Sequence, residues 1–127
     1  MMFLSEDWLN AFTDRLGSLP PWEGPSHAVQ FEVTGGPSGK VTYHVVVPAG
    51  GTPKYRPGAA DDRGVVITQE WADALAQARG QFDPAVGFMQ GHMKVKGSSR
   101  PLLDLFSVMA DPHYAQAVAA LASDTEY

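Results

Sequence analysis

Histidines and one pair of adjacent aspartates are the side chains of this sequence that come closest to supporting bond chemistry. The histidines are His27, His44, His92 and His113. None stands in a metal-binding spacing such as HxH or HExxH. His44 and His92 fall on the polar faces of predicted strands, and Asp61-Asp62 falls in a loop. We interpret all of them as surface groups, while a composite site of His44 and His92 across a sheet stays open.

Other catalytic patterns are also missing from the sequence. There is no GxSxG nucleophile elbow, and the chain has no cysteine to act as a nucleophile or a metal ligand. The segments TGGPSGK and PAGGTPK do not match the phosphate-binding pattern GxxxxGK[ST], and neither leads from a strand into a helix. The sequence therefore predicts no catalytic residue, no metal site and no cofactor.

Length and charge narrow the class of protein further. The 127 residues fit a single domain spanning 1–127, and 44% of them are hydrophobic. A net charge of -5 argues against a nucleic-acid partner. The local basic set of Lys94, Lys96 and Arg100 is interpreted as a solvated strand edge.

No apolar run approaches the roughly 18 residues that cross a bilayer, and the first residues carry no signal-peptide pattern. We expect a cytoplasmic protein that does not span a membrane.

The periodicity of the first half predicts a helix, a hairpin and a third strand. Ser5 is placed to cap a helix whose apolar residues recur at helical spacing up to Leu16. Alternating residues predict strands over 29–34 and 41–47, joined by the turn GGPSG. Residues 48–64 form the longest stretch without a pattern and are expected to be a loop or a flap over a site. A short strand then covers 65–67, and Thr68 is expected to cap the next helix.

Two Asp-Pro pairs predict helix starts in the second half. In each pair the aspartate can cap the helix while proline takes the first helical position. These pairs are Asp83-Pro84 and Asp111-Pro112. Between them, a strand is expected over 92–96, with Met93 and Val95 on one face. A helix over 100–110 follows, and its expected inward side consists of Leu102, Leu103, Phe106 and Met109.

Two segments resemble the sterol-carrier-protein-2 (SCP-2) lipid-binding family. They are GQFDPAVGFMQGHMKVKGSSRPLLDLFSVM, from Gly80 to Met109, and ITQEWADAL, from Ile67 to Leu75. The order of elements is similar from Phe3 to about Leu121. The chain departs from the frequent Gly-Asp-Met pattern after the strand, because it has Gly97-Ser98-Ser99 instead.

The resemblance implies an α+β fold and an apolar ligand. The expected architecture is an SCP-2-like, five-stranded, mostly antiparallel sheet with helices packed on one face around an apolar tunnel. The implied ligand is a fatty acid, acyl-CoA, sterol or isoprenoid-like lipid, bound or transferred without catalysis. We further expect a monomer or homodimer that is capable of transient membrane contact.

Inward faces of the predicted elements give twelve candidate ligand-binding residues. They are Trp71, Leu75, Phe82, Val86, Met89, Met93, Leu102, Leu103, Phe106, Met109, Tyr114 and Val118. Two other functions stay open. One is a small cyclase or isomerase for a polyketide- or terpenoid-like substrate, with His44, His92 and Asp104 as candidate groups. The other is an interaction module that buries the apolar faces of 100–110 and 112–122 against a second subunit.

Overall fold

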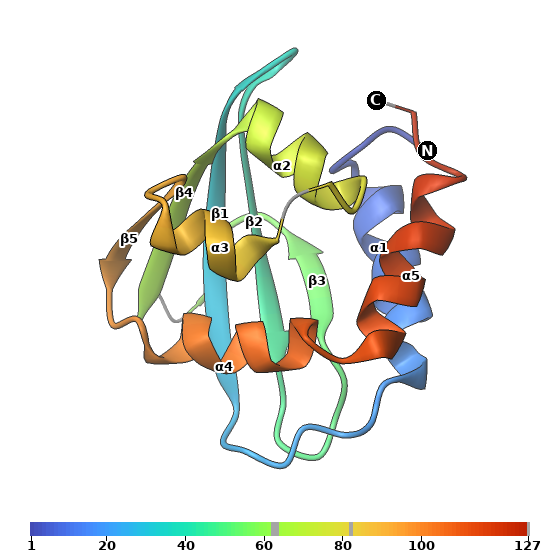
Figure 1. Cartoon of the computed structure of the whole chain (residues 1–127), viewed down its shortest axis with the longest axis vertical. Coiled ribbons are helices and arrows are strands. Elements are labelled where there is room, and N and C mark those ends of the chain that lie inside the picture. The colour runs from blue at the N-terminus through green and yellow to red at the C-terminus, as the bar shows by residue number, and fades with distance from the viewer. Residues whose placement is uncertain (62–63, 82, 127) are drawn as a thin grey trace.

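The protein is described by a computed structural model that covers residues 1–61, 64–81 and 83–126 (Figure 1). In chain order the elements are α1 (Glu6–Arg15), the 3-10 turn η1 (Leu16–Ser18), β1 (His27–Gly36), β2 (Gly39–Val47), β3 (Lys54–Pro57), β4 (Val65–Glu70), α2 (Trp71–Ala78), α3 (Pro84–Met89), β5 (Met93–Gly97), α4 (Arg100–Met109) and α5 (Pro112–Ala122). Within this part of the chain, no helix has the length and apolar character needed to cross a bilayer.

The strands form one mixed sheet in the order β3-β2-β1-β4-β5. Three neighbouring pairs are antiparallel, namely β3-β2, β2-β1 and β4-β5. β1 and β4 run parallel, with Phe31 opposite Ile67. The predicted α+β fold with a five-stranded, mostly antiparallel sheet is thus confirmed.

One face of the sheet carries the core. On β1, Val29, Phe31 and Val33 are buried, whereas the intervening Glu32 is partly exposed. This alternation arises because successive strand side chains point to opposite faces of the sheet. The helices pack over the buried face, with α3 and α4 crossing the sheet and α1 and α5 lying beside its β3 edge (Figure 1).

Local capping chemistry explains where three of the helices begin, as predicted. The Ser5 hydroxyl accepts a hydrogen bond from the Trp8 amide at 3.2 Å. The Asp83 carboxylate accepts from the Ala85 amide at 2.9 Å, and Asp111 accepts from the His113 amide at 2.8 Å. Each cap supplies an acceptor for an N–H group that has no partner inside its helix.

The predicted start of the second long helix was wrong. Thr68 does not cap it, because β4 continues through Glu70 and α2 starts at Trp71. Thr68 instead pairs with Glu32 of β1 on one side and with Lys94 of β5 on the other. Pairing with two neighbouring strands outweighs the local capping preference of a threonine.

The segment 48–64 is not a structureless loop, because it contains β3 at the sheet edge. The part of it that follows β3 lies against the sheet face opposite the helices. There, the Ala60 amide donates to the side-chain oxygen of the buried Gln30 at 3.1 Å. The His44 ring lies 2.9 Å from the Gly58 carbonyl oxygen. Residues 62–63 lie outside the described residues.

The inward side of α4 also differs from the predicted one. Leu102 and Leu105 are fully buried, whereas Leu103 is 47% exposed. The sequence pattern includes Leu103 in the inward side and leaves Leu105 out of it. A helix that is apolar nearly all round does not reveal from its own sequence which side faces the core.

Candidate ligand-binding cavity

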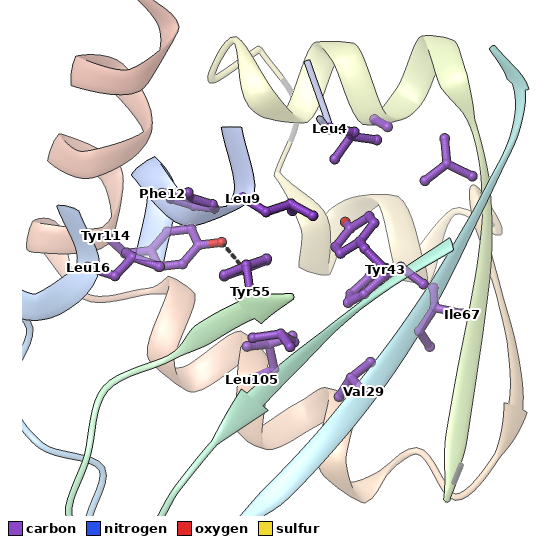
Figure 2. Close-up of a cluster of buried hydrophobic side chains, with 14 of the residues drawn as sticks. Leu4, Leu9, Phe12, Leu16, Val29, Tyr43, Tyr55, Ile67, Leu105 and Tyr114 are labelled. Atoms are coloured by element: carbon purple, nitrogen blue, oxygen red, sulfur yellow. Dashed lines mark hydrogen bonds between the residues drawn. The ribbon is translucent and has the colours of Figure 1, made fainter. Parts of the chain in front are cut away.

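A cavity of about 220 Å³ lies between the sheet and the helices, at the end of the molecule where α1 and α5 meet. Its floor is formed by inward side chains of the sheet, and its walls come from α1, α2 and α5. Figure 2 shows part of this region, with Phe12, Tyr55 and Tyr114 gathered between helix and sheet. An apolar cavity enclosed between two layers is the usual form of a small-molecule site.

Aromatic side chains dominate the cavity lining. The aromatic lining residues are Phe3, Trp8, Phe12, Phe31, Tyr43, Tyr55 and Tyr114. The rings pack on one another: Phe31 stacks on Tyr43 with centroids 5.0 Å apart, and Phe12 lies 4.6 Å from Tyr55. These ring contacts fix the side chains in place, so the wall is formed before any ligand arrives.

Three tyrosine hydroxyls place polar atoms in this otherwise apolar wall. The hydroxyls of Tyr55 and Tyr114 are 2.7 Å apart and share a hydrogen bond (Figure 2). Burial raises the pKa of Tyr43, Tyr55 and Tyr114, and neighbouring tyrosines in the cluster raise it further at Tyr43 and Tyr55. All three therefore remain neutral hydrogen-bonding groups at physiological pH.

The cavity meets solvent between the end of α2 and α5. Three lining residues here are exposed, namely Arg79 and Gly80, which follow α2, and Ala119 of α5. Near this end, the side-chain amides of Gln69 and Gln77 lie 3.5 Å apart. The exposed end of the lining thus carries Arg79, while the interior carries aromatic rings, hydroxyls and the amide of the buried Gln69.

Three of the twelve predicted ligand-binding residues line this cavity: Met109, Tyr114 and Val118. They come from the end of α4 and from α5, which form one wall. Their contact with a ligand stays a prediction.

The other predicted residues lie elsewhere in the fold. Met93 and Leu102 are part of the buried core, and three more pack partly buried against it, namely Trp71, Leu75 and Phe106. Three are exposed on α3 and α4: Val86 at 48%, Met89 at 84% and Leu103 at 47%. Phe82 lies outside the described residues.

The predicted list left out the N-terminal helix and the sheet floor. Trp8 and Phe12 of α1 line the cavity, as do Phe31 and Tyr43. The sequence signal for the strand residues was present, because Phe31 and Tyr43 stand at the apolar positions of alternating strands. Tyr55 carried no such signal, since it lies in the Pro- and Gly-rich segment 48–64.

The candidate catalytic groups do not line the cavity. His44 is on the opposite face of the sheet, and the His92 ring lies 3.3 Å from the Asp73 carboxylate. Asp104 forms an ion pair with Arg100 at 3.4 Å on α4. His44 is on β2 and His92 precedes β5, so β1 and β4 separate them and the composite site does not form.

The described part of the chain shows no metal cluster, and a second hollow lies apart from this cavity. Among the residues with described positions, no three acidic or histidine side chains could share a metal ion. The second hollow, of about 360 Å³, lies beside Trp22 and Asp111, but prolines and loop residues form much of its lining.

The architecture is that of sterol carrier protein 2 domains. A conserved hypothetical protein from Thermus thermophilus, proposed to be a sterol carrier protein, superposes with a TM-score of 0.70. It is 17% identical, and the match covers 95% of this chain and 90% of that one. The expected family resemblance is thus confirmed for the fold.

Two more solved structures show the same arrangement. A crystal structure of sterol carrier protein 2 matches with a TM-score of 0.64 at 17% identity, covering 98% of this chain and 99% of that one. A palmitated sterol carrier protein 2-like protein from Aedes aegypti matches with a TM-score of 0.66 at 18% identity, covering 87% and 96% of the two chains. No known family profile matches the sequence, and no curated protein matches it either.

Proposed function

We propose that the protein binds an apolar small molecule in this cavity and carries it without changing it chemically. Candidate ligands are fatty acids, acyl-CoA, sterols and isoprenoid-like lipids. The observation that carries the proposal is the aromatic cavity between sheet and helices, in which the described lining residues include no histidine or carboxylate. The palmitated state of the Aedes aegypti protein, which has the same fold, supports the same class of ligand.

The size of the cavity bears on how a ligand would be held. At about 220 Å³ it is smaller than the roughly 300–1,000 Å³ of typical ligand sites. Each buried CH₂ group contributes about 0.8 kcal/mol, so twelve would contribute roughly 10 kcal/mol before the costs of association. We therefore expect either partial insertion of a long chain or an outward shift of α5 to admit more of it.

Native mass spectrometry of freshly purified protein, followed by extraction, is the first test. A lipid that copurifies at near-stoichiometric amount would support the carrier function and identify its class. A protein that remains free of ligand and fails to bind dodecanoate would contradict it. Turnover of an added polyketide- or terpenoid-like compound would favour the enzyme instead.

A pair of substitutions on α4 tests which surface holds the ligand. Met109→Asp places a carboxylate in the cavity wall and should weaken dodecanoate binding at least tenfold, because an unpaired charge is costly in an apolar site. Leu103→Asp is the matched control, since Leu103 is on the same helix but 47% exposed. Displacement of a fluorescent fatty acid measures binding, and circular dichroism checks the fold.

The comparison also separates the cavity from the predicted α3–α4 surface. If Leu103→Asp abolished binding while Met109→Asp retained it, the ligand would be held on the exposed apolar side of α3 and α4. If both folded variants bound dodecanoate as tightly as wild type, neither surface would be the ligand-binding site.

A further inference from the structure

Tyr43, Tyr55 and Tyr114 meet in the cavity from three different elements, namely β2, β3 and α5. They are 7%, 4% and 7% exposed. The ring centroids of Tyr43 and Tyr55 are 6.1 Å apart, so the phenols form one cluster. Figure 2 shows the Tyr43 ring extending from its strand towards the helix layer.

A count of protons shows that the protein alone does not use all the hydrogen-bond donors of this cluster. Three hydroxyls carry three protons, and one proton is used in the bond between Tyr55 and Tyr114. The Tyr43 hydroxyl makes no hydrogen bond to any described residue, and neither does the remaining proton of the pair. The Tyr43 hydroxyl is not sealed off from the cavity, so water or a ligand inside the cavity can accept its hydrogen bond.

The chemistry of the donors selects the kind of acceptor. Each phenol is neutral, and Arg79, the cationic group among the described lining residues, is at the exposed end. A carboxylate next to the tyrosines would lose its hydration without gaining a counter-charge, which is unfavourable. An uncharged oxygen is far less costly to bury, and a carbonyl has two lone pairs to accept from such donors.

We propose that the cavity selects apolar molecules that carry an uncharged oxygen acceptor, such as a ketone, ester or ether oxygen, which binds to Tyr43 or to the unused hydroxyl of the Tyr55–Tyr114 pair. This inference rests on the proposed function and specifies its ligand. An anionic lipid would bind in the opposite orientation, with its head group near Arg79 at the exposed end of the cavity.

Matched nine-carbon probes test the inference: 2-nonanone, 1-nonene and nonanoate, each displacing a fluorescent fatty acid from wild type, Tyr43→Phe and Tyr114→Phe. The loss of one neutral hydrogen bond should weaken 2-nonanone binding about 3- to 10-fold in Tyr43→Phe. Binding of 1-nonene and nonanoate should change less than about twofold, because neither places an oxygen at the tyrosines. Tyr114→Phe removes one hydroxyl but also releases the Tyr55 hydroxyl from the shared bond, so two free protons remain and 2-nonanone binding should change less than in Tyr43→Phe.

Infrared spectroscopy of carbonyl-labelled 2-nonanone gives a readout that does not depend on affinity. The carbonyl stretch of 2-nonanone bound to wild type should lie below its frequency in an alkane solvent, and part of this difference should disappear in Tyr43→Phe. If 1-nonene binds but neither substitution distinguishes 2-nonanone from it, the tyrosines serve only the structure or bound water. The inference then fails while the proposed function stands. If no probe displaces the fluorescent fatty acid, both fail.

Discussion

Gly97 shows how one residue can hold a sheet edge together. It ends β5 with φ of +99°, a region that favours glycine, and it pairs with Val65 of β4. A Cβ atom added there would overlap the Gly64 carbonyl oxygen. Because that neighbour is backbone, it cannot move aside as a side chain would.

Replacing Gly97 by alanine should therefore lower the free energy of unfolding by about 3 kcal/mol, through backbone strain and the clash together. Gly91→Ala is the matched control, since its φ is +81° and its surroundings are open. That change should cost only about 1–2 kcal/mol of strain. Urea unfolding of the two variants checks the difference, and equal losses would argue against a close approach at Gly97.

His27 links stability to pH at the start of β1. Neither of its buried ring nitrogens has a hydrogen-bond partner among the described residues, and its ring lies edge-on to Trp22. Burial lowers the pKa of His27 below its usual 6.5, and the negative charge of Asp104 offsets part of this effect. Between the two pKa values the unfolded chain binds a proton that the folded chain does not.

The free energy of unfolding should therefore fall as the pH drops below about 6.5, and it should be highest above that value. His27→Phe removes the titrating group and keeps a ring beside Trp22. The stability of wild type relative to this variant should decline between pH 7 and pH 5 in urea titrations. Parallel curves for the two proteins would show that the His27 pKa is the same in the folded and unfolded chains.

At the scale of elements, β3 depends on a helix as well as on a strand. It pairs with β2 on one side, and on the other the Tyr55 amide donates to the Thr13 hydroxyl of α1 at 2.8 Å. That hydroxyl lies 3.0 Å from the Leu9 carbonyl oxygen and 3.2 Å from the Tyr55 carbonyl oxygen, either of which can accept its proton. A threonine on α1 thus satisfies an edge strand that would otherwise be unpaired.

Thr13→Val keeps the shape of the side chain and removes this acceptor. The Tyr55 amide then loses its partner, which should cost about 1–3 kcal/mol and speed hydrogen exchange at that amide. Ser107→Ala serves as the control, because its exposed hydroxyl only contacts the Leu103 carbonyl oxygen at 3.3 Å. Unchanged exchange at Tyr55 in Thr13→Val would mean that β3 is held by β2 alone.

These elements also show what the sequence can and cannot predict. Caps such as Asp83 and Asp111 were predicted correctly because their partners lie two or three residues along the chain. β3 was missed because its partners, β2 and Thr13, are distant in sequence. The inward side of α4 was misplaced because only packing distinguishes Leu105 from Leu103 in an apolar helix.

At the scale of the whole molecule, the cavity exists only when both ends of the chain meet. The termini lie side by side (Figure 1), and Met2 forms a bridge with Glu126. The Trp8 ring N–H donates to the Thr125 hydroxyl at 3.1 Å, and Arg15 pairs with Asp124 at 2.6 Å. Because α1 and α5 together form the cavity walls, no local segment could have revealed the site. The predicted residues that do line the cavity, such as Val118, all come from the C-terminal part of the chain.

This arrangement predicts where ligand binding will rigidify the protein. Dodecanoate at about 100 times its dissociation constant should stabilise the fold by about 2.7 kcal/mol, if it binds only the folded chain. Hydrogen exchange should then slow in α1, β3 and α5 together, since these elements contribute Phe12, Tyr55 and Val118 to the cavity. The exposed side of α3 around Met89 should change little.

Hydrogen exchange measured by mass spectrometry with and without dodecanoate distinguishes the two ends of the molecule. Slowing confined to α3 and the first turn of α4 would place the ligand on the opposite end and overturn the assignment of the cavity, because rigidity gained on binding must include the elements that touch the ligand.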